Sequence, residues 1–392
     1  MREVVVVSGA RTAIGDYGGS LKDLPATKLG AVAIREAVAR AKVDPASVGH
    51  AVVGSVIHGE AKDMYLSRVA AVEAGLPVGT PCLTVNRLCG SGLQAVVSAA
   101  QHILLGDCDT AVAGGAESMS RAAYFLPSGR WGQRMGDAAV VDAMTGALHD
   151  PFGHGHMGVT AENIAAKYGF TREQQDQFAV ESHRRASKAL ESGHFKSQIV
   201  PIELKTRKGV EQFTTDERVR KDASMENMAK LKAVFKKDGT VTAANASGIN
   251  DAAAAVVLMD STVAKSRNIK PMARLVAYAH AGVEPQLMGL GPIPAVRRVF
   301  EKAGLKPADM DVVESNEAFA VQAMAVTKDL GLDPARVNPN GGAVALGHPV
   351  GATGAILTVK ALYELERTQK RYALVTMCIG GGQGIAAIFE RM

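Results

Sequence analysis

The chain contains an internal repeat, which constrains the fold more than any other feature because repeated segments imply repeated supersecondary units. Three pairs of segments correspond, and they occur in the same order in each half of the chain. The pairs are AIREAVARAKVDPASVGHAV (33–52) with AVRRVFEKAGLKPADMDVVE (295–314), VNRLCGSGLQAV (85–96) with VALGHPVGATGAI (344–356), and DTAVAGGAES (109–118) with ALVTMCIGGGQG (373–384). One match can arise by chance, whereas three in order predict a duplicated chain with two similar halves.

Short apolar runs alternate with segments in which apolar residues recur every three or four positions, which is typical of an α/β fold. The runs predict strands at Val4–Ser8, Ala51–Val56, Ala111–Ala113, Ala253–Met259, Val312–Glu314 and Ala373–Met377. The periodic segments predict helices at Leu29–Ala41, Leu93–Leu105, Ala295–Ala303 and Ala352–Leu365. A polar, irregular region at 119–249 separates the halves.

Composition excludes several classes of protein. With 47% hydrophobic residues among 392, the chain can bury a large core and is not disordered. A net charge of +5 is too small to indicate nucleic acid but suits an anionic small ligand. The sequence has no leader pattern and no apolar run of about 18 residues, so we expect neither a signal peptide nor a membrane span. The four cysteines form no CxxC pair, which favours reduced thiols in the cytoplasm: Cys82, Cys89, Cys108 and Cys378.

Cys89 is the first candidate for chemistry. A strand-like LTV precedes it, and Gly90 to Gly92 open a helical segment. A thiol at a helix N-terminus faces unpaired N–H groups and the positive end of the helix dipole, which favours the nucleophilic thiolate. A buried cysteine that acts as a small hydrophobe is the alternative, and we keep that interpretation for Cys82 and Cys108.

His348 lies in Gly347-His348-Pro349, also at the start of a helical segment. A base beside a thiol is what nucleophilic catalysis needs. The repeat places His348 where Cys89 stands in the first half. If the halves pack with pseudo-twofold symmetry, the two helix N-termini point at one site; a purely structural histidine is the alternative.

Cys378 and Asn316 are two further candidates. Cys378 follows the strand-like ALVTM and precedes Gly380-Gly381-Gly382, so it could exchange protons while the loop amides bind an oxyanion. Core packing is the alternative for Cys378. Asn316 follows the strand-like DVVE, and its side chain could orient a water or cap a helix.

Other kinds of site are disfavoured. His149, His154 and His156 lie close together, but the glycines between them fix no common face and no cysteine joins them, so a metal site is weakly supported. The sequence has no GxxxxGK[ST] phosphate loop, no GxSxG serine turn and no GxGxxG dinucleotide motif. Segment 203–238 holds ten Lys or Arg and seven Asp or Glu, which taken alone indicates a solvated surface.

Four motifs resemble the signature blocks of the thiolase family: VNRLCGSGLQAV, NEAF, NPNGGAVALGHPVGATG and ALVTMCIGGGQG. The resemblance covers essentially the whole chain, including HMGVTAEN and TAANASGINDAAAAV in the central region. Within the family, the chain looks most like bacterial acetyl-CoA acetyltransferases and the broad-range 3-ketothiolases of polyhydroxyalkanoate-making bacteria.

The resemblance implies an architecture and an assembly. The expected fold is two thiolase-type α/β halves, layered α-β-α-β-α, with an inserted loop domain. The N-terminal half would consist of 1–118 together with 250–268, and the C-terminal half would be 269–392. The loop domain would be 119–249. The family also implies a homodimer or a homotetramer built as a dimer of dimers, with 120–145 as the tetramer contact.

The resemblance also implies catalytic roles. Cys89 would be the nucleophile that becomes S-acylated, and His348 would activate it. Cys378 would protonate the leaving acetyl-CoA carbanion, or remove a proton from acetyl-CoA in condensation. Asn316, through a water, and His348 would hold one thioester oxygen. The backbone N–H groups of Cys89 and Gly380 would form the other oxyanion hole.

The implied activity is reversible Claisen condensation and thiolysis of 3-ketoacyl-CoA by a ping-pong course, with coenzyme A and acyl-CoA as substrates, no permanently bound cofactor and no metal. Positions matching the coenzyme A channel are Arg220, Asn227, Met228, Leu231, Phe235, Ala246, Ser247, Ala318 and Phe319. Positions matching the acyl pocket are His156, Met157 and Met288. Asn227 departs from the family pattern, because close relatives often have Ser there.

Two other functions fit parts of the sequence. A decarboxylating condensing enzyme, like the ketoacyl synthases, uses a Cys with two His and lacks the second cysteine, so Cys378 disfavours it. A non-catalytic acyl-CoA-binding relative is disfavoured because Cys89, His348, Asn316 and Cys378 are all present. The acyl range and the physiological direction stay open, although the broad-range relatives suggest ketoacyl groups slightly longer than acetoacetyl.

Overall fold

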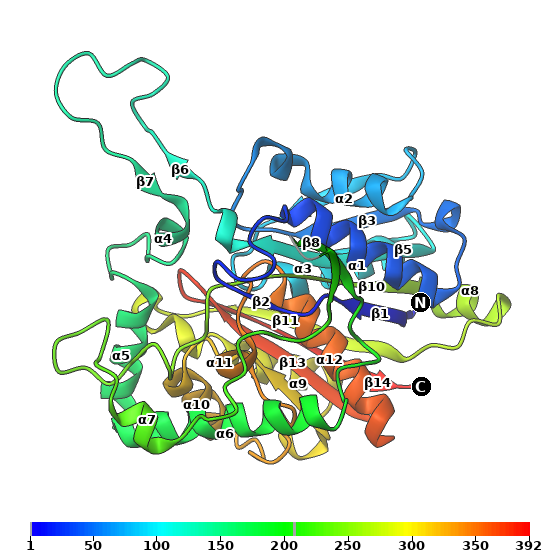
Figure 1. Ribbon diagram of the computed structural model, residues 1–392. Helices are drawn as coiled ribbons and strands as arrows, with labels where there is room; N and C mark the ends of the chain where they lie inside the picture. The colour runs from blue at the N-terminus through cyan, green and yellow to red at the C-terminus, as the bar shows by residue number, and fades with distance from the viewer. Residues whose placement is uncertain (1, 207–208) are drawn as a thin grey trace.

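The computed structural model describes residues 2–206 and 209–392, and its central feature is one large mixed sheet (Figure 1). The strands follow the order β12-β13-β14-β11-β1-β10-β5-β3-β4, and the short β2 pairs with β10. Their bounds are β1 Val4–Arg11, β2 Gly15–Asp16, β3 His50–Gly54, β4 Cys82–Val85, β5 Thr110–Ser118, β10 Asn250–Asp260, β11 Ala273–Gly282, β12 Val312–Ser315, β13 Tyr372–Ile379 and β14 Gln383–Arg391.

The predicted duplication is confirmed by the topology of this sheet. The first half runs β1-β10-β5-β3 and the second half runs β11-β14-β13-β12. In each half the last pair is parallel and the other two pairs are antiparallel. Within the sheet of the described residues, the two halves pair at Val5 with Arg274 and at Val6 with Ala273, so the sheet consists of two units with a narrow seam.

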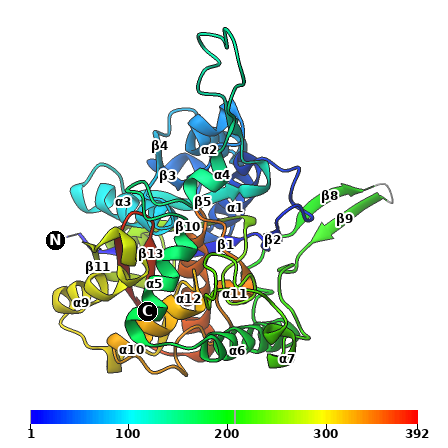
Figure 2. The same ribbon diagram turned by 90° about the vertical axis from the view of Figure 1, so that its left-hand side faces the viewer.

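Helices complete the layered α-β-α-β-α arrangement that was predicted (Figure 2). Helix α1 (Ala26–Ala41), joined by α2 (Leu66–Ala74), covers the first unit of the sheet, and α9 (Pro292–Ala303) covers the second. Helices α3 (Ser91–Leu105) and α12 (Thr353–Thr368) contact each other and strands of both units. Because they lie between the two units of the sheet, α3 and α12 bury most of their residues.

The glycines at the starts of α3 and α12 allow these helices to touch backbone to backbone. A Cβ on Gly92 would lie 2.6 Å from the backbone nitrogen of Ala355, closer than any real Cβ contact. A Cβ on Gly354 would likewise collide with the backbone of Leu93. This reciprocal contact brings the two N-termini to one place, as the repeat predicted.

The pairing of the repeats nevertheless differs from the sequence interpretation. Strands β3 and β12 and helices α3 and α12 correspond with an offset of 262 residues, from His50 to Val312 and from Ser91 to Thr353. That offset does not set His348 on Cys89, so the predicted equivalence of these two residues is wrong by three positions. His348 lies in the link between α11 (Ala343–Leu346) and α12 rather than in the first turn of a helix.

The glycines of GGAES also differ from their supposed counterpart. Gly114 and Gly115 lie inside β5 rather than in a loop after it. A Cβ on Gly115 would collide with the backbone of Gly351, so a close approach of two chain segments explains this glycine. By contrast, Gly380 to Gly382 form the turn between β13 and β14, where Gly381 and Gly382 have positive φ.

The region between β5 and β10 is more regular than its polar sequence suggested. It contains α4 (Ala143–Ala147), α5 (Met157–Tyr168), α6 (Arg172–Glu191), α7 (Met225–Ala229), the hairpin β6 (Tyr124–Phe125) and β7 (Val141–Asp142), and the hairpin β8 (Ile202–Thr206) and β9 (Gly209–Phe213). Two cations of the charged 203–238 segment, Arg207 and Lys208, lie outside the described residues.

A buried ion pair holds this region against the sheet. The Arg11 guanidinium, at the end of β1, donates to both carboxylate oxygens of Asp216 at 2.8 and 3.0 Å and to Gln198 Oε1 at 2.7 Å. Arg11 and Asp216 are both buried, so removing either partner would leave an uncompensated charge in the interior. The region is therefore attached to the first unit of the sheet by more than its covalent ends.

The window Leu88–Leu105 is the one stretch of the described residues that is long and apolar enough to cross a membrane by composition. More than half of it, 56%, is buried, and it includes α3 between the two sheet units. A core helix accounts for its apolar character.

Candidate active site

A cavity of about 500 Å³ opens where the two halves and the 119–249 region meet. Cys89, His348, Cys378 and Gly380 all line it, so four of the five predicted catalytic positions come together. The other lining residues are Asp16, Tyr17, Val56, Leu88, Met119, Ala147, Leu148, His156, Met157, Arg218, Val234, Phe235, Ala243, Ala246, Ser247, Gly248, Ile249, Met288, Ala318, Phe319 and Val350.

Cys89 lies in a tight turn between β4 and α3. Leu88, just before it, has a left-handed backbone with φ of 46°, which is unfavourable for a branched apolar residue. Ser91 Oγ closes the turn by accepting from Arg87 N at 2.9 Å and donating to Leu88 O at 2.6 Å. The strained turn presents the Cys89 sulfur to the cavity.

The protonation state of Cys89 differs from the sequence expectation. Burial raises the pKa of the Cys89 thiol, and the nearby Glu117 carboxylate acts in the same direction. Hydrogen bonds from the backbone N–H groups of Gly380 and of Cys89 itself lower it, but by less than burial raises it. Cys89 therefore rests as a thiol and needs a base.

His348 is held in a state that can act as that base. Burial lowers the pKa of His348 to about 4, so the imidazole is neutral near pH 7. The Thr353 hydroxyl donates its single hydrogen to Pro349 O at 2.9 Å, so the 2.7 Å contact between Thr353 Oγ1 and His348 Nδ1 takes its hydrogen from Nδ1. Nε2 then keeps its lone pair. Asn250 Oδ1 fixes the backbone by accepting from His348 N at 2.9 Å.

Asn316 lies beside His348 and is fully buried. Its Nδ2 is 3.4 Å from His348 Nε2, and its backbone N–H donates to Thr376 O at 3.0 Å. Asn316 Oδ1 has no hydrogen-bond partner among the described residues, which suits a site that receives a water or a ligand. The alternative of helix capping is wrong, because α10 (Ala320–Asp329) begins after Phe319 and has no side-chain cap.

Cys378 is the penultimate residue of β13 and is buried. Burial, followed by the neighbouring Cys89 sulfur, raises the pKa of the Cys378 thiol well above its usual range. Both cysteines line the same cavity. A thiol of this kind holds its proton firmly until a strongly basic carbon or sulfur takes it.

Aromatic and small residues form the walls. His156 caps α5 by accepting from Gly158 N at Nδ1, and its ring stacks on Phe235 with centroids 4.6 Å apart. Two strand-like segments run side by side, since Ala246 bridges to Phe319 and Ser247 N donates to Ala318 O at 3.0 Å. The predicted Met157 and Met288 also line the cavity.

Four predicted coenzyme A positions do not line this cavity: Arg220, Asn227, Met228 and Leu231. Three of them are exposed, but Met228 is buried in a small cluster with Ala179 and Val344. The structure thus groups the predicted wall residues around the catalytic ones and separates these four from them.

Several residues of the site were missed from sequence. Glu117 is buried and accepts from the backbone N–H groups of Val56, Ile57 and Gly351 at 2.8 to 3.1 Å, and burial raises its pKa to about 8. Its carboxylate ties the loop after β3 to the turn after His348. The one sequence signal for Glu117 was its place in GGAES, the segment that the repeat pairs with the strand and glycine turn of Cys378.

Arg218 is the missed cation of the cavity. Its guanidinium lies 3.5 Å from Asp16 Oδ1 and donates to the carbonyl groups of Val344 and Ala243. No local pattern marks Asp16 or Arg218, since contacts between distant segments bring them together. In the described ranges, no group of three or more His, Cys, Asp or Glu is placed to hold a metal ion, and His149 and His156 meet edge to face.

Comparison with known proteins gives one consistent result. Residues 4–262 match the thiolase N-terminal domain and residues 269–391 match the thiolase C-terminal domain. The chain is 66% identical to "Beta-ketothiolase BktB" of Cupriavidus necator over 392 residues, covering 100% of both chains. It is 49% identical to "Acetyl-CoA acetyltransferase" of Allochromatium vinosum, covering 99% of each chain.

Solved structures agree. A crystal structure of human mitochondrial 3-ketoacyl-CoA thiolase superposes with a TM-score of 0.97 at 43% identity, covering 100% of this chain and 99% of that one. A structure of the human mitochondrial enzyme in complex with CoA gives a TM-score of 0.97 at 42% identity, covering 100% and 98%.

The raised pKa of Cys89 predicts how its alkylation depends on pH. The thiolate is the reactive form, and an ordinary cysteine has a pKa of about 8.5. With a raised pKa, the rate of Cys89 modification by iodoacetamide should still be rising between about pH 7 and about pH 9 rather than levelling off. Mass spectrometry of the Cys89 peptide measures this rate. Cys89→Ser is the control for labelling of the other thiols, and a plateau reached below pH 7 would contradict the prediction.

Proposed function

The chain belongs to the thiolase family, and from that premise we propose how its residues perform the reaction. It is an acyltransferase, a 3-ketoacyl-CoA thiolase of the acetyl-CoA acetyltransferase type. The observation that carries the residue assignments is the meeting of Cys89, His348, Cys378 and Gly380 in one cavity.

In thiolysis, His348 Nε2 takes the proton of the Cys89 thiol while the sulfur attacks the 3-keto carbon of the substrate. Negative charge then develops on the former ketone oxygen, and the backbone N–H groups of Cys89 and Gly380 are the donors for it. The left-handed turn at Leu88 supports this role, because it fixes the Cys89 N–H before substrate arrives.

The bond between C2 and C3 then breaks, and its electron pair leaves as the enolate of acetyl-CoA. The enolate oxygen accepts from the protonated His348 and from a water bound to Asn316. The Cys378 thiol gives its proton to C2, which releases acetyl-CoA and leaves the acyl group on Cys89. The high pKa of Cys378 supports this step, because the proton stays on sulfur until the carbanion forms.

Coenzyme A enters next and completes the cycle. The Cys378 thiolate takes the proton of the coenzyme A thiol, whose sulfur attacks the acyl group on Cys89. The Cys89 sulfur leaves and receives its proton back from His348. The proton that Cys378 gave to C2 is thus replaced by the proton of the coenzyme A thiol, and every residue regains its resting protonation state. Condensation is the same course in reverse.

We assign the coenzyme A path to the wall formed by Phe235, Ala246, Ser247, Ala318 and Phe319, with its outer end near Arg220, Asn227 and Leu231. Met228 is left out of this path, because it is buried in a cluster with Ala179 and Val344. The CoA complex of the human enzyme supports coenzyme A binding in such a fold. Coenzyme A then acts as a passing substrate, with no permanently bound cofactor.

The domains divide the work. Residues 1–118 with 250–268 and residues 269–392 form the catalytic halves, and the loop domain 119–249 covers coenzyme A and contributes to assembly. A reducing compartment, the cytoplasm, suits a reaction in which Cys89 and Cys378 must both be thiols.

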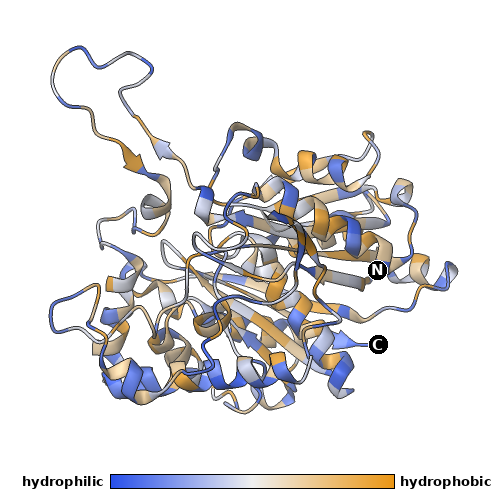
Figure 3. Cartoon of the chain, in the orientation of Figure 1, coloured by the Kyte–Doolittle hydropathy of each residue, from blue (hydrophilic) through white to orange (hydrophobic). Residues whose placement is uncertain are grey.

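A homotetramer built as a dimer of dimers accounts for two exposed features. Among the described residues, strand β4 ends the sheet and pairs only with β3, and a free edge strand invites pairing with a second copy. The arm, residues 122–142, projects from the body (Figure 3). Its exposed large apolar side chains are Tyr124, Phe125, Leu126, Trp131, Met135, Val140 and Val141.

Two substitutions separate the proposed roles of the cysteines. Cys378→Ala should still become labelled at Cys89 by radiolabelled acetyl-CoA, but it should lose thiolysis and condensation because no group protonates C2. Cys89→Ser should lose the labelling itself. Peptide mapping and a thiolysis assay measure the two effects, and full turnover by Cys378→Ala would remove Cys378 from the mechanism.

The acyl range follows from the apolar residues around Cys89, which include Met119, Leu148 and Val350. Since one buried methylene is worth about 0.8 kcal/mol, kcat/KM for 3-ketovaleryl-CoA should stay within about tenfold of acetoacetyl-CoA. Thiolysis assays with acetoacetyl-, 3-ketovaleryl- and 3-ketohexanoyl-CoA test this range. A loss above about a hundredfold on adding the first methylene would restrict the enzyme to acetoacetyl-CoA.

The arm predicts the effect of a charge on assembly. Trp131 is 89% exposed in the single chain, so Trp131→Asp should convert tetramers to dimers. Thiolysis should stay intact, because the proposed catalytic residues line a cavity of the same chain and Trp131 does not line it. Sedimentation velocity measures the assembly. Val210→Asp, at another exposed apolar residue, is the control; tetramers of Trp131→Asp would exclude the arm as the contact.

A further inference from the structure

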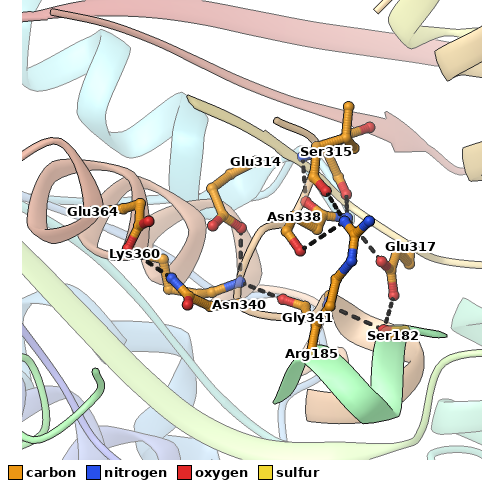
Figure 4. Close-up of polar contacts among 12 residues, drawn as sticks. Ser182, Arg185, Glu314, Ser315, Glu317, Asn338, Asn340, Gly341, Lys360 and Glu364 are labelled. Carbon is orange, nitrogen blue, oxygen red and sulfur yellow. Dashed lines mark hydrogen bonds and ion pairs between the residues drawn. The ribbon is translucent and has the colours of Figure 1, made fainter. Parts of the chain in front are cut away.

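We propose that Glu317 is a positioning residue that couples the loop carrying Asn316 to the loop carrying His348, an inference that rests on the proposed thiolase reaction. Glu317 does not line the cavity, but it directly follows Asn316 in sequence and is buried. The Glu317 network, defined as Ser182, Glu317, Asn338 and Val344, joins three separate parts of the chain (Figure 4 shows the first three).

Both carboxylate oxygens of Glu317 are engaged. Oε1 accepts from Asn338 Nδ2 at 2.8 Å. Oε2 accepts from Ser182 Oγ at 2.7 Å and from the backbone N–H of Val344 at 3.1 Å. Burial raises the pKa of Glu317, whereas these three donors favour its ionised form. The network therefore depends on an acceptor-only group at this position.

Asn338 fixes the chain on both sides of Asn316. Its Oδ1 accepts from Ser315 N at 2.9 Å, and its Nδ2 donates to Ser315 O at 2.8 Å as well as to Glu317 (Figure 4). Asn338 itself has a left-handed backbone with φ of 45°, a conformation that asparagine tolerates better than most residues. One buried amide thus holds both neighbours of Asn316.

The other end of the network reaches the loop of His348. Val344 belongs to α11, which ends at Leu346, two residues before His348. Ser182 Oγ, which donates to Glu317, also accepts from Gly342 N at 3.1 Å. A Cβ on Gly342 would collide with the Glu317 carboxylate, so the chain leaves space for this group.

The loop of Asn316 and the loop of His348 meet where these two side chains would hold the enolate oxygen. Asn316 Nδ2 and His348 Nε2 are 3.4 Å apart, and the backbone contacts of the Glu317 network set where each loop begins. His348 has two further supports, from Asn250 and Thr353, whereas Asn316 relies on the network and on Thr376. Loss of the network should therefore disturb the Asn316 side more than the His348 side.

Glu317→Gln is the direct test. It keeps the shape of the side chain but replaces one carboxylate oxygen by an NH₂ group, which then faces an N–H or O–H donor of the network. Since a displacement of about 1 Å can cost about a hundredfold in rate, kcat for thiolysis of acetoacetyl-CoA should fall about 10- to 100-fold. Acetylation of Cys89 by acetyl-CoA uses the other oxyanion hole, so its single-turnover rate should fall much less. Ser182→Ala, which removes one donor, should show the same pattern with a smaller loss.

Ser8→Ala is the matched control, because it removes a buried 2.6 Å hydrogen bond to Ala37 O in the first half of the chain. It should lower Tm without separating the two rates. Equal losses in both rates, or wild-type kcat in Glu317→Gln and Ser182→Ala, would overturn the positioning role. If Glu317→Gln does not fold, Ser182→Ala decides alone. Absence of thiolysis in the wild-type enzyme would instead refute the proposed function.

Discussion

The structure depends on the backbone contact between the first turns of α3 and α12. Gly92 and Gly354 each face main-chain atoms of the opposite helix, so neither position has space for a side chain. The contact is formed by atoms that every residue shares, and it therefore fixes the distance between the helices more tightly than flexible side chains could. Cys89 precedes one of these turns and His348 precedes the other, so their separation follows from the same contact.

Around this contact the protein keeps the reacting groups neutral at rest. Cys89 and Cys378 are thiols and His348 is an unprotonated imidazole, because burial opposes charge at all three. In the proposed reaction, charge would develop on these groups only when substrate is bound, next to backbone N–H groups that are already oriented. Glu117, the acidic group nearby, is held by three amides of the loops it connects. The charged end of coenzyme A would stay at the exposed mouth, away from this chemistry.

The sequence predicted two similar α/β halves because the repeat is encoded in local patterns that both halves share, and the layers followed from the family resemblance. It failed where a property comes from the tertiary structure. The thiolate expected at Cys89 is opposed by burial, which no helix-terminal motif reveals. Asn316 fits a cap in isolation, but α10 begins only after Phe319, and Asn316 lies beside His348, which is distant in sequence. Helix α6 was missed in a polar region, although the Thr171–Gln174 capping box was readable.

The common offset between the halves has an evolutionary consequence. A single unduplicated unit would lack half of the α3–α12 contact, so it could form that contact only with a second copy of itself. Such a homodimer would carry identical loops on both sides of its twofold axis. Covalent fusion of two such units would let the two corresponding loops differ in sequence. One copy could then specialise as the turn of Cys89, the proposed nucleophile, while the other carries Asn316, His348 and Cys378, the proposed amide, base and acid.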